Sequence, residues 1–158
     1  MILVTLGTND KSFERLLAEV ERLIDLGVIR EEVLVQAGKT AYHSEKMKIW
    51  DLLPMNEMER LTEQCSLLIT HGGVGSIISG LKHGKCVIAI PRLERFKEHV
   101  NDHQLQIIRN FNTSGCIIGT EGVEELENAL EKSKTFVPQP YQSNTKNMVD
   151  LIRRHINA

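Results

Sequence analysis

A run of glycines beside a histidine is the stretch of this chain whose residue types and spacing best suit chemistry. It reads His71-Gly72-Gly73-Val74-Gly75-Ser76 and stands between an apolar run, Leu67–Ile69, and apolar residues at helical spacing. Glycine leaves backbone N–H groups uncovered, and at a helix start these groups point outward at the positive end of the helix dipole. The turn therefore suits a phosphate or diphosphate, although the same glycines also fit a tight turn that packs a helix against a sheet without a ligand.

The spacing of the glycines excludes two nucleotide-binding motifs. No Gly-Lys-Ser/Thr follows at the distance that a Walker loop requires. In the dinucleotide-binding pattern Gly-x-Gly-x-x-Gly, Ile78 stands where the third glycine belongs. The glycine-rich turn thus belongs to neither motif.

Basic residues after Pro91 form a second candidate group. Arg92, Arg95 and Lys97 follow an apolar strand, Cys86–Ile90, at its carboxyl end. Their charges suit contact with a diphosphate, or with the phosphates of a membrane-bound acceptor. A solvated loop with local ion pairs is the alternative.

Two polar pairs also lie where predicted elements begin or end. Thr8 and Asn9 follow the first strand, Ile2–Leu6, and ligands of open α/β sheets bind at this carboxyl edge, so both are candidates for sugar or acceptor contact. Plain turn and capping roles are their alternative. His103 and Gln104 stand in the first turn of a predicted helix, near the positive end of its dipole, where a histidine is otherwise often a surface residue.

The elements that must position these residues alternate between strands and helices. Short apolar runs predict buried strands at Ile2–Leu6, Val33–Val35, Leu67–Ile69, Cys86–Ile90 and Cys116–Ile118, and Met47–Leu53 is an ambiguous sixth. Apolar stripes predict five helices that alternate with these strands. The first is capped by Ser12 and ends at Gly27, and the second runs over Glu57–Gln64 with a capping box formed by Asn56 and Glu59. The third runs from the glycine-rich turn to Gly84, the fourth begins at Asn101, and the fifth covers Glu121–Lys132.

This alternation predicts an α/β fold, a Rossmann-like doubly wound parallel sheet. We expect one domain over residues 1–158, with a linker at 135–143 and an amphipathic C-terminal helix at 144–158. The linker holds Pro138 and Pro140, and the helix carries one apolar stripe with a basic margin.

Composition limits the classes of function. The chain has 158 residues, 41% of them hydrophobic, and a net charge of −2, so no global positive field recruits nucleic acid. Its apolar runs fall far short of the ~20 residues that span a bilayer, and it opens on a strand without a basic leader, so we expect a cytoplasmic protein. Cys65, Cys86 and Cys116 adjoin apolar strands, which favours buried free thiols over ligands or nucleophiles.

A longer pattern joins the glycine-rich turn to the residues around it. It comprises His71-Gly72-Gly73-x-Gly75-Ser76, Gly84-Lys85, Pro91, Asn101-Asp102-His103-Gln104 and, at the start of the chain, Val4-Thr5-Leu6-Gly7-Thr8. The pattern resembles the nucleotide-sugar signature of GT-B glycosyltransferases, and most of all the family 28 C-terminal domain, which includes small capsule and exopolysaccharide galactosyltransferase subunits of bacteria. One departure is Ser79, where many relatives carry an acidic residue that holds the ribose hydroxyls.

The resemblance implies the donor-binding, catalytic half of a GT-B enzyme whose acceptor-binding half is a separate membrane-anchored subunit, which would hold this chain at the inner face of the membrane. It implies inverting transfer of a hexose from a UDP-sugar donor to a lipid-linked acceptor, with galactose preferred and N-acetylglucosamine second. A non-catalytic nucleotide-sugar-binding activator is an alternative that Ser79 keeps open. A sugar-nucleotide epimerase is weaker, because such enzymes carry both halves in one chain.

The resemblance also implies roles for single residues. The amides of Gly72, Gly73, Gly75 and Ser76 would stabilise the departing diphosphate, and the His103-Gln104 pair would lie over the diphosphate and the sugar. No cofactor is implied, and no Asp-x-Asp occurs, which agrees with a reaction that needs no metal. The pattern does not identify the general base, which a partner could supply.

Overall fold

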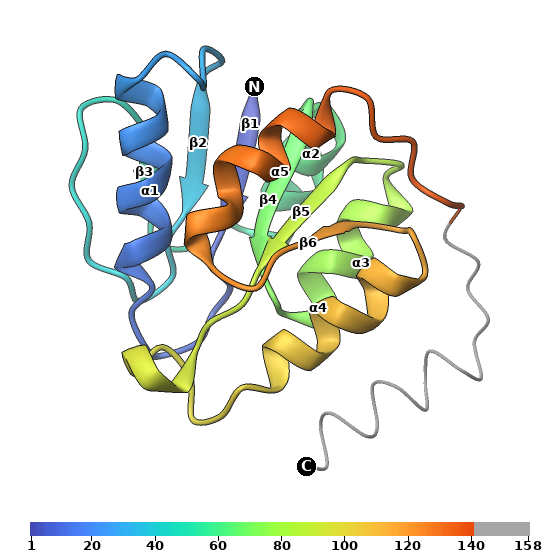
Figure 1. Cartoon of the computed structure of the whole chain (residues 1–158). Helices are drawn as coiled ribbons and strands as arrows, with labels where there is room; N and C mark the ends of the chain where they lie inside the picture. The colour runs from blue at the N-terminus through green and yellow to red at the C-terminus, as the bar shows by residue number, and fades with distance from the viewer. Residues whose placement is uncertain (141–158) are drawn as a thin grey trace.

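The computed structural model describes residues 1–140, in which six strands form one open, wholly parallel sheet (Figure 1). The strands are β1 (Ile2–Thr5), β2 (Val33–Gln36), β3 (Lys48–Trp50), β4 (Leu67–His71), β5 (Val87–Ile90) and β6 (Ile118–Gly119). Their order is β3-β2-β1-β4-β5-β6, and every neighbouring pair is parallel. The chain winds outward from β1, then returns to place β4 beside it, so the predicted doubly wound Rossmann-like sheet is confirmed.

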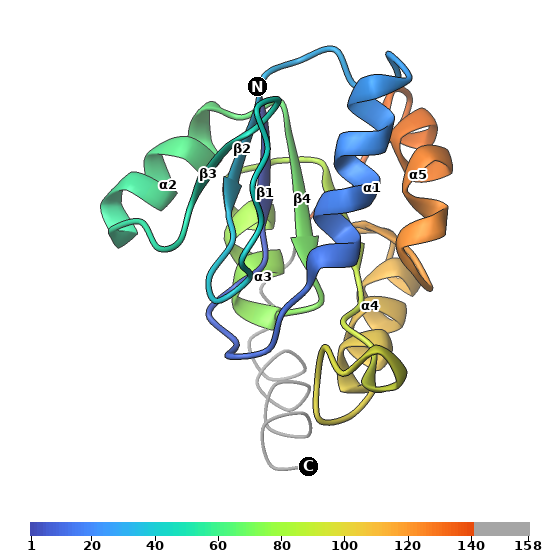
Figure 2. The ribbon, with the colours of Figure 1, turned by 90° about the vertical axis from the view of Figure 1, so that its left-hand side faces the viewer.

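Helices cover both faces of the sheet. They are α1 (Glu14–Asp25), α2 (Met55–Gln64), α3 (Val74–Lys82), α4 (His103–Thr113) and α5 (Leu126–Ser133), with short 3-10 turns η1 (Glu94–Phe96) and η2 (Val123–Glu125). Side chains of α1 and α5 share one apolar core with the sheet, and those of α2, α3 and α4 share the other. Figure 2 shows α1 and α5 on one side of the strands and α2 and α3 on the other.

Successive side chains along each strand point alternately into these two cores. In β1, Ile2 and Val4 point to the core beneath α1, whereas Leu3 points to the core beneath α3. Because both faces are covered, the four residues of β1 are all buried, as expected of parallel strands in an α/β protein. The apolar stripe predicted for the first helix is also confirmed, with Leu16, Leu17, Val20 and Leu23 buried.

Both predicted helix caps are wrong. The first helix begins after Phe13 and lacks a side-chain cap, and the Phe13 N–H instead donates to Thr40 Oγ1 at 2.9 Å. The second helix begins at Met55, directly after Pro54, whose carbonyl accepts from the N–H groups of the first turn. Asn56 therefore lies inside the helix instead of capping it. The stops at Gly27 and Gly84 are confirmed, since both glycines adopt the left-handed φ that ends a helix.

Several boundaries differ from the sequence prediction. Strand β4 runs on to His71, and β3 keeps only the centre of the ambiguous Met47–Leu53 segment. Helix α4 begins at His103 and not at Asn101, because the Asn101 Oδ1 atom accepts the His103 N–H in a turn. All three cysteines are free, and two are buried while Cys86 is half-buried.

The predicted C-terminal helix, 144–158, and residues 141–143 of the linker lie outside the described residues. Residues 136–140 form no helix or strand, and the N–H of Gln139 donates to the Gly115 carbonyl at 2.9 Å. Within residues 1–140, every helix is too short or too polar to cross a bilayer.

Candidate functional site

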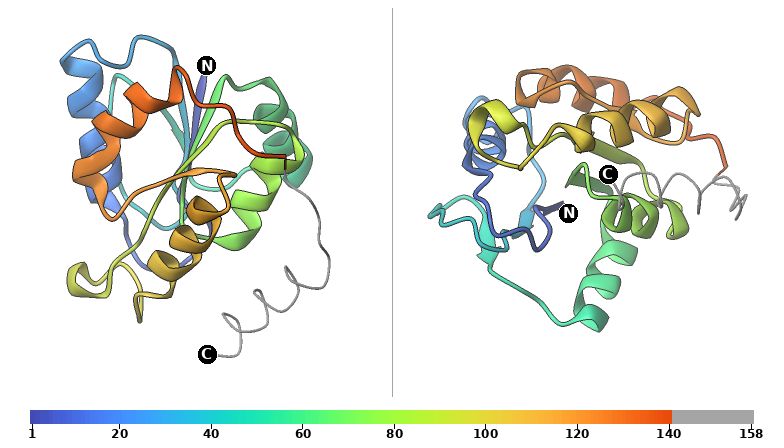
Figure 3. Two further views of the ribbon diagram at one scale, coloured as in Figure 1. Left: turned by 45° about the vertical axis from the view of Figure 1, so that its right-hand side comes forward. Right: turned by 90° about the horizontal axis from the view of Figure 1, so that it is seen from below.

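The loops after β1, β4 and β5 meet at the carboxyl edge of the sheet, which faces the viewer in the right panel of Figure 3. A pocket of about 480 Å³ lies there, at the switch point between β1 and β4. Seven of the predicted site residues line it, namely Thr8, Asn9, His71, Gly73, Gly75, Ser76 and Gln104, together with Gly7 and Gln36. The structure thus brings together segments that are more than 90 residues apart in the chain.

The start of α3 opens into this pocket. Gly73 occupies the N-cap position without a side-chain cap, and the first hydrogen bond inside the helix runs from the Ile77 N–H to the Gly73 carbonyl. The N–H groups of Val74, Gly75 and Ser76 therefore have no acceptor within the helix. At Gly75 an added Cβ would meet nothing within 4 Å, so this backbone is open to a ligand. The geometry suits an anion.

His71, the last residue of β4, lies with its ring between two glycines. A Cβ added at Gly7 would sit 2.3 Å from His71 Nε2, and one added at Gly73 would sit 2.3 Å from His71 Cε1. These two glycines therefore make room for the imidazole, a role that neither the phosphate site nor the packing turn expected from the sequence includes. Burial, followed by the nearby charge of Arg92, lowers the pKa of His71 to about 3, so the ring is neutral at neutral pH.

Gln104 is buried in the first turn of α4 and bonds to the chain around β4. Its Oε1 atom accepts from the N–H of Gly72 at 3.0 Å and from the N–H of Arg92 at 3.1 Å, and its Nε2 atom lies 3.1 Å from His71 Nδ1. The Gly72 N–H is therefore already used, which corrects its expected role as a diphosphate donor. A Cβ at Gly72 would sit 2.6 Å from Gln104 Cβ, so this glycine leaves space for the glutamine.

Arg92 is a clear correction, because its side chain is 0% exposed. Its guanidinium donates to the carbonyl oxygens of Leu6 at 2.6 Å, Lys11 at 2.7 Å and Glu98 at 3.2 Å. Burial lowers the pKa of Arg92 to about 10, which leaves it charged at neutral pH. The buried Arg92 side chain thus holds carbonyl groups of two loops together and is not among the residues that line the pocket, so the expected direct contact with a diphosphate does not fit this position.

The segment after Arg92 is more ordered than a solvated loop. The Glu98 carboxylate is buried, forms two hydrogen bonds with Arg15 at 2.8 and 2.9 Å, and accepts the Leu93 N–H. Only Arg95 and Lys97 of the three predicted cations are exposed. His103 is half-buried and is not among the residues that line the pocket.

Gln36 is a pocket residue that sequence reasoning missed. It ends β2, it is buried, and its Oε1 atom accepts the Leu53 N–H at 3.0 Å. A polar residue at the carboxyl end of an otherwise apolar strand was the available signal. Thr8 and Gln36 also line a neighbouring pocket of about 370 Å³, as do Gly75 and Ser76.

The neighbouring pocket has an apolar wall. Its other lining residues are Thr5, Leu52, Leu53, Met55, Met58, Thr62, Leu68 and Ser79. Met55 is 80% exposed at the rim. Since four residues belong to both pockets, the two form one continuous site with a polar end at α3 and an apolar end at α2.

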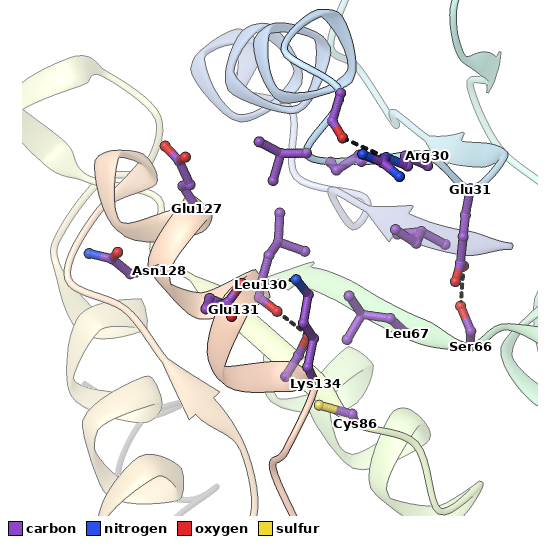
Figure 4. A pocket seen from close by; sticks show the side chains of 15 residues that line it. Arg30, Glu31, Ser66, Leu67, Cys86, Glu127, Asn128, Leu130, Glu131 and Lys134 are labelled. Carbon is purple, nitrogen blue, oxygen red and sulfur yellow. Dashed lines mark hydrogen bonds and ion pairs between the residues drawn. The ribbon is translucent and has the colours of Figure 1, made fainter.

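A third hollow, of about 800 Å³, lies at the opposite, amino edge of the sheet. Figure 4 shows Arg30 and Glu31 on one side of it and Glu131 of α5 on the other, and Lys134, which directly follows α5, and Cys86 also line it. None of the predicted site residues lines it. In the part of the chain that the structure describes, no three His, Cys, Asp or Glu side chains gather in a way that could hold a metal ion.

An open parallel sheet whose switch point faces a glycine-rich helix start is typical of Rossmann-like domains that bind a nucleotide at this edge. The chain belongs to the glycosyltransferase family 28 C-terminal domain family, whose model matches residues 1–156. This confirms the family resemblance. A comparison with curated proteins gave no match.

Solved structures show the same fold at low sequence identity. A solution structure of ALG13 matches at 19% identity with a TM-score of 0.63, over 99% of this chain and 96% of ALG13. The glycosyltransferase SnogD from Streptomyces nogalater matches at 18% identity with a TM-score of 0.55, over 99% of this chain and 39% of SnogD. MurG from Acinetobacter baumannii matches at 17% identity with a TM-score of 0.54, over 97% of this chain and 49% of MurG. The chain therefore spans less than half the length of SnogD and MurG.

Proposed function

We propose that this chain is the donor-binding, catalytic subunit of a glycosyltransferase that moves a hexose from a UDP-sugar to a lipid-diphosphate-linked sugar. The observation that carries the proposal is the uncapped start of α3, which opens into a pocket at the switch point of a family 28 domain. Galactose is the preferred sugar and N-acetylglucosamine the second, in the synthesis of a capsule or exopolysaccharide.

The proposed reaction separates charge at the pocket. The acceptor hydroxyl attacks the anomeric carbon of the donor from the opposite face, the bond from that carbon to the diphosphate oxygen breaks, and UDP leaves with the electron pair. In this proposal the N–H groups of Gly75 and Ser76, which are left without acceptors at the start of α3, donate to the diphosphate oxygens where this negative charge develops, and the helix dipole adds to them. The proton of the acceptor passes to a general base, which a partner subunit could supply.

The nucleoside fits the neighbouring pocket. Its apolar wall, which includes Leu53 and Met58, suits the flat face of a base, while the shared residues Gly75 and Ser76 face the diphosphate. Ser79 lies in this pocket and offers a neutral hydroxyl in place of the acid that the family pattern implies. We therefore expect weaker binding of the ribose hydroxyls than a carboxylate would give.

The acceptor-binding half is proposed to be a second, membrane-anchored subunit, which holds this chain at the inner face of the membrane. Exposed apolar side chains beside the site, Leu52 at 58% and Met55 at 80%, supply a surface for such a partner. The C-terminal helix predicted at 144–158 is a second proposed docking element.

A non-catalytic role is the second candidate. The neutral Ser79 in the nucleoside pocket favours a module that binds a nucleotide-sugar and activates a partner. Transfer of labelled galactose from UDP-galactose, measured with the partner present, separates the two candidates. Substitution of Gly75 abolishes transfer if this chain holds the reacting donor, whereas transfer persists if the partner holds it.

Titration calorimetry with UDP in the presence of a chelator tests the donor site. We expect saturable binding without added metal, because backbone amides and the α3 dipole neutralise the diphosphate. Strict dependence of UDP binding on a divalent ion would contradict binding by the amides and the dipole alone.

A truncated chain tests docking through the C-terminal segment. A chain ending at residue 143 is expected to bind UDP but no longer to co-purify with the membrane partner. Retained co-purification rules out docking through 144–158.

A further inference from the structure

The hydrogen bonds of Gln104 determine which way its side-chain amide faces. Backbone N–H groups are always donors, and two of them, from Gly72 and Arg92, point at the same side-chain atom at 3.0 and 3.1 Å. That atom must be the carbonyl oxygen of the amide, because an NH₂ group cannot accept these bonds. The NH₂ group of Gln104 therefore faces His71 Nδ1, 3.1 Å away.

The orientation of the Gln104 amide also determines which nitrogen of the His71 ring carries the proton. An NH₂ group only donates, so His71 Nδ1 must be the acceptor and carries no proton. A neutral imidazole then holds its proton on Nε2. We propose that Gln104 is a positioning residue that fixes His71 in the Nε2–H tautomer, so that the ring presents a neutral N–H donor at the ligand pocket.

The surroundings of the ring support this assignment. His71 and Gln104 are only 7% and 6% exposed, so water has little access to exchange the tautomers. Nε2 lies beside Gly7 and Gly73, and both glycines line the pocket at the carboxyl edge. The charged or titratable groups near the ring are Arg92 and His99, and both act with burial to keep the imidazole uncharged.

The consequence for an anion is direct. An Nε2–H group donates to a phosphate oxygen, whereas the opposite tautomer would point a lone pair at it. That the anion is the donor diphosphate rests on the proposed function, but the tautomer itself does not depend on it. Gln104 then acts on the ligand through His71, in place of the direct sugar contact that the sequence pattern implied.

Long-range ¹H–¹⁵N correlation spectra of the ligand-free protein, labelled on its histidines, test the proposal. The two nitrogen shifts of a ring distinguish the Nε2–H tautomer, the Nδ1–H tautomer and the imidazolium, and His71→Asn assigns the His71 signals by their loss. We expect His71 in the wild type to be neutral with its proton on Nε2 at pH 7. A proton on Nδ1, or an even mixture of tautomers, would overturn the proposal.

Gln104→Glu supplies the second arm. A carboxylate can still accept from Gly72 and Arg92, but its other oxygen cannot donate to His71, so we expect a proton to appear on Nδ1. Gln106→Glu is the matched control, since Gln106 is exposed on the same helix and the same charge change should leave the ring as in wild type. An unchanged His71 spectrum in folded Gln104→Glu contradicts the proposal.

Nucleotide binding separates this proposal from the proposed function. Gln104→Leu should weaken UDP binding by roughly tenfold or more, the usual effect of losing one hydrogen bond to a charged group. If wild type shows the Nε2–H tautomer but binds no UDP, the proposed donor site is wrong and the role of Gln104 stands. If UDP binds but the proton lies on Nδ1, the role of Gln104 is wrong and the donor site stands.

Discussion

The guanidinium of Arg92 donates a hydrogen bond of 2.6 Å to the carbonyl oxygen of Leu6, from which it is separated by 86 positions in the chain. Leu6 begins the loop that carries Thr8 and Asn9, and Arg92 follows the strand β5. The same guanidinium also donates to the Lys11 carbonyl at the far side of that loop. One buried cation thus fixes both ends of the loop that forms one wall of the pocket.

Arg92→Met should therefore destabilise the protein. Three backbone carbonyl oxygens would lose a charged donor in a buried setting, so we expect the free energy of unfolding to fall by about 3 kcal/mol. Urea denaturation at pH 7 measures this loss. Arg95→Met is the matched control, because Arg95 is exposed three positions along, and its midpoint should match wild type. Equal midpoints for both variants would contradict the structural role of Arg92.

Gly75→Ala and Gly73→Val should both weaken UDP binding, for different reasons. A methyl group at Gly75 meets no protein atom within 4 Å and so projects into the pocket, while alanine improves helix propensity by ~1 kcal/mol. Binding should fall with no loss of thermal stability. Valine at Gly73 would collide with the His71 ring, so we expect lower affinity and a lower melting temperature.

Calorimetry with UDP and thermal denaturation, applied to both variants, check this pair. If Gly75→Ala binds UDP like wild type, the ligand does not approach the start of α3. If Gly73→Val keeps wild-type stability, the His71 ring does not pack closely against this glycine.

Acid should lower the free energy of unfolding, because the buried His71 ring is neutral in the folded protein. Its pKa in the folded protein is about 3, below the ordinary value of 6.5, so the unfolded state binds a proton that the folded state does not. The stabilisation is present above pH 6.5 and is lost as the pH falls toward 3. Between these values one such group changes the free energy of unfolding by about 1.4 kcal/mol per pH unit.

Urea denaturation between pH 4.5 and 6.5 measures that slope. His71→Asn removes the titrating group, so its stability should depend less steeply on pH than that of wild type by about 1.4 kcal/mol per pH unit. Parallel pH dependences in the two proteins would show that His71 is not buried as a neutral ring.

Ser79→Glu should strengthen nucleotide binding and make it depend on the ribose hydroxyls. A carboxylate in the nucleoside pocket can accept hydrogen bonds from both hydroxyls, which a serine cannot do with equal strength. We expect the variant to prefer UDP over 2′-deoxy-UDP by about tenfold, equivalent to ~1.4 kcal/mol. Ser79→Gln, similar in length but uncharged, controls for size. Equal affinities for the two nucleotides in Ser79→Glu would place the ribose elsewhere.

The outline of the fold could be predicted from local patterns. Buried parallel strands are short apolar runs, so Val33–Gln36 and Val87–Ile90 are recognisable within one residue. The glycine-rich turn marks a helix start, and the rule that ligands bind at the carboxyl edge brings Thr8 and Asn9 to the same place as Gly75. Each of these inferences depends on residues that are close in sequence or on a general property of such sheets.

The helix caps and the roles of buried polar residues could not be predicted in this way. Phe13 donates its N–H to Thr40, a residue 27 positions away, so no local pattern around Ser12 reveals how the helix begins. Arg92 looks like a ligand contact in the sequence because a cation after a strand is usually exposed. Two of its three carbonyl partners, Leu6 and Lys11, come from another loop, and only the tertiary structure shows that they are there.

The sequence by itself therefore determined the order of elements, the doubly wound sheet and the edge where the candidate site lies, because these follow from periodicity and chain direction. Tertiary structure alone decided what the glycines accommodate. Gly7 and Gly73 make room for His71, and Gly72 for Gln104, while Gly75 stays open to the pocket. For Gly7 and Gly72 the side chain that packs against the backbone comes from more than 30 positions away, and the His71 ring reaches Gly73 only because of how the turn folds. Hydrogen bonds such as that between Gln104 and Gly72 exist only once the strands and helices have assembled.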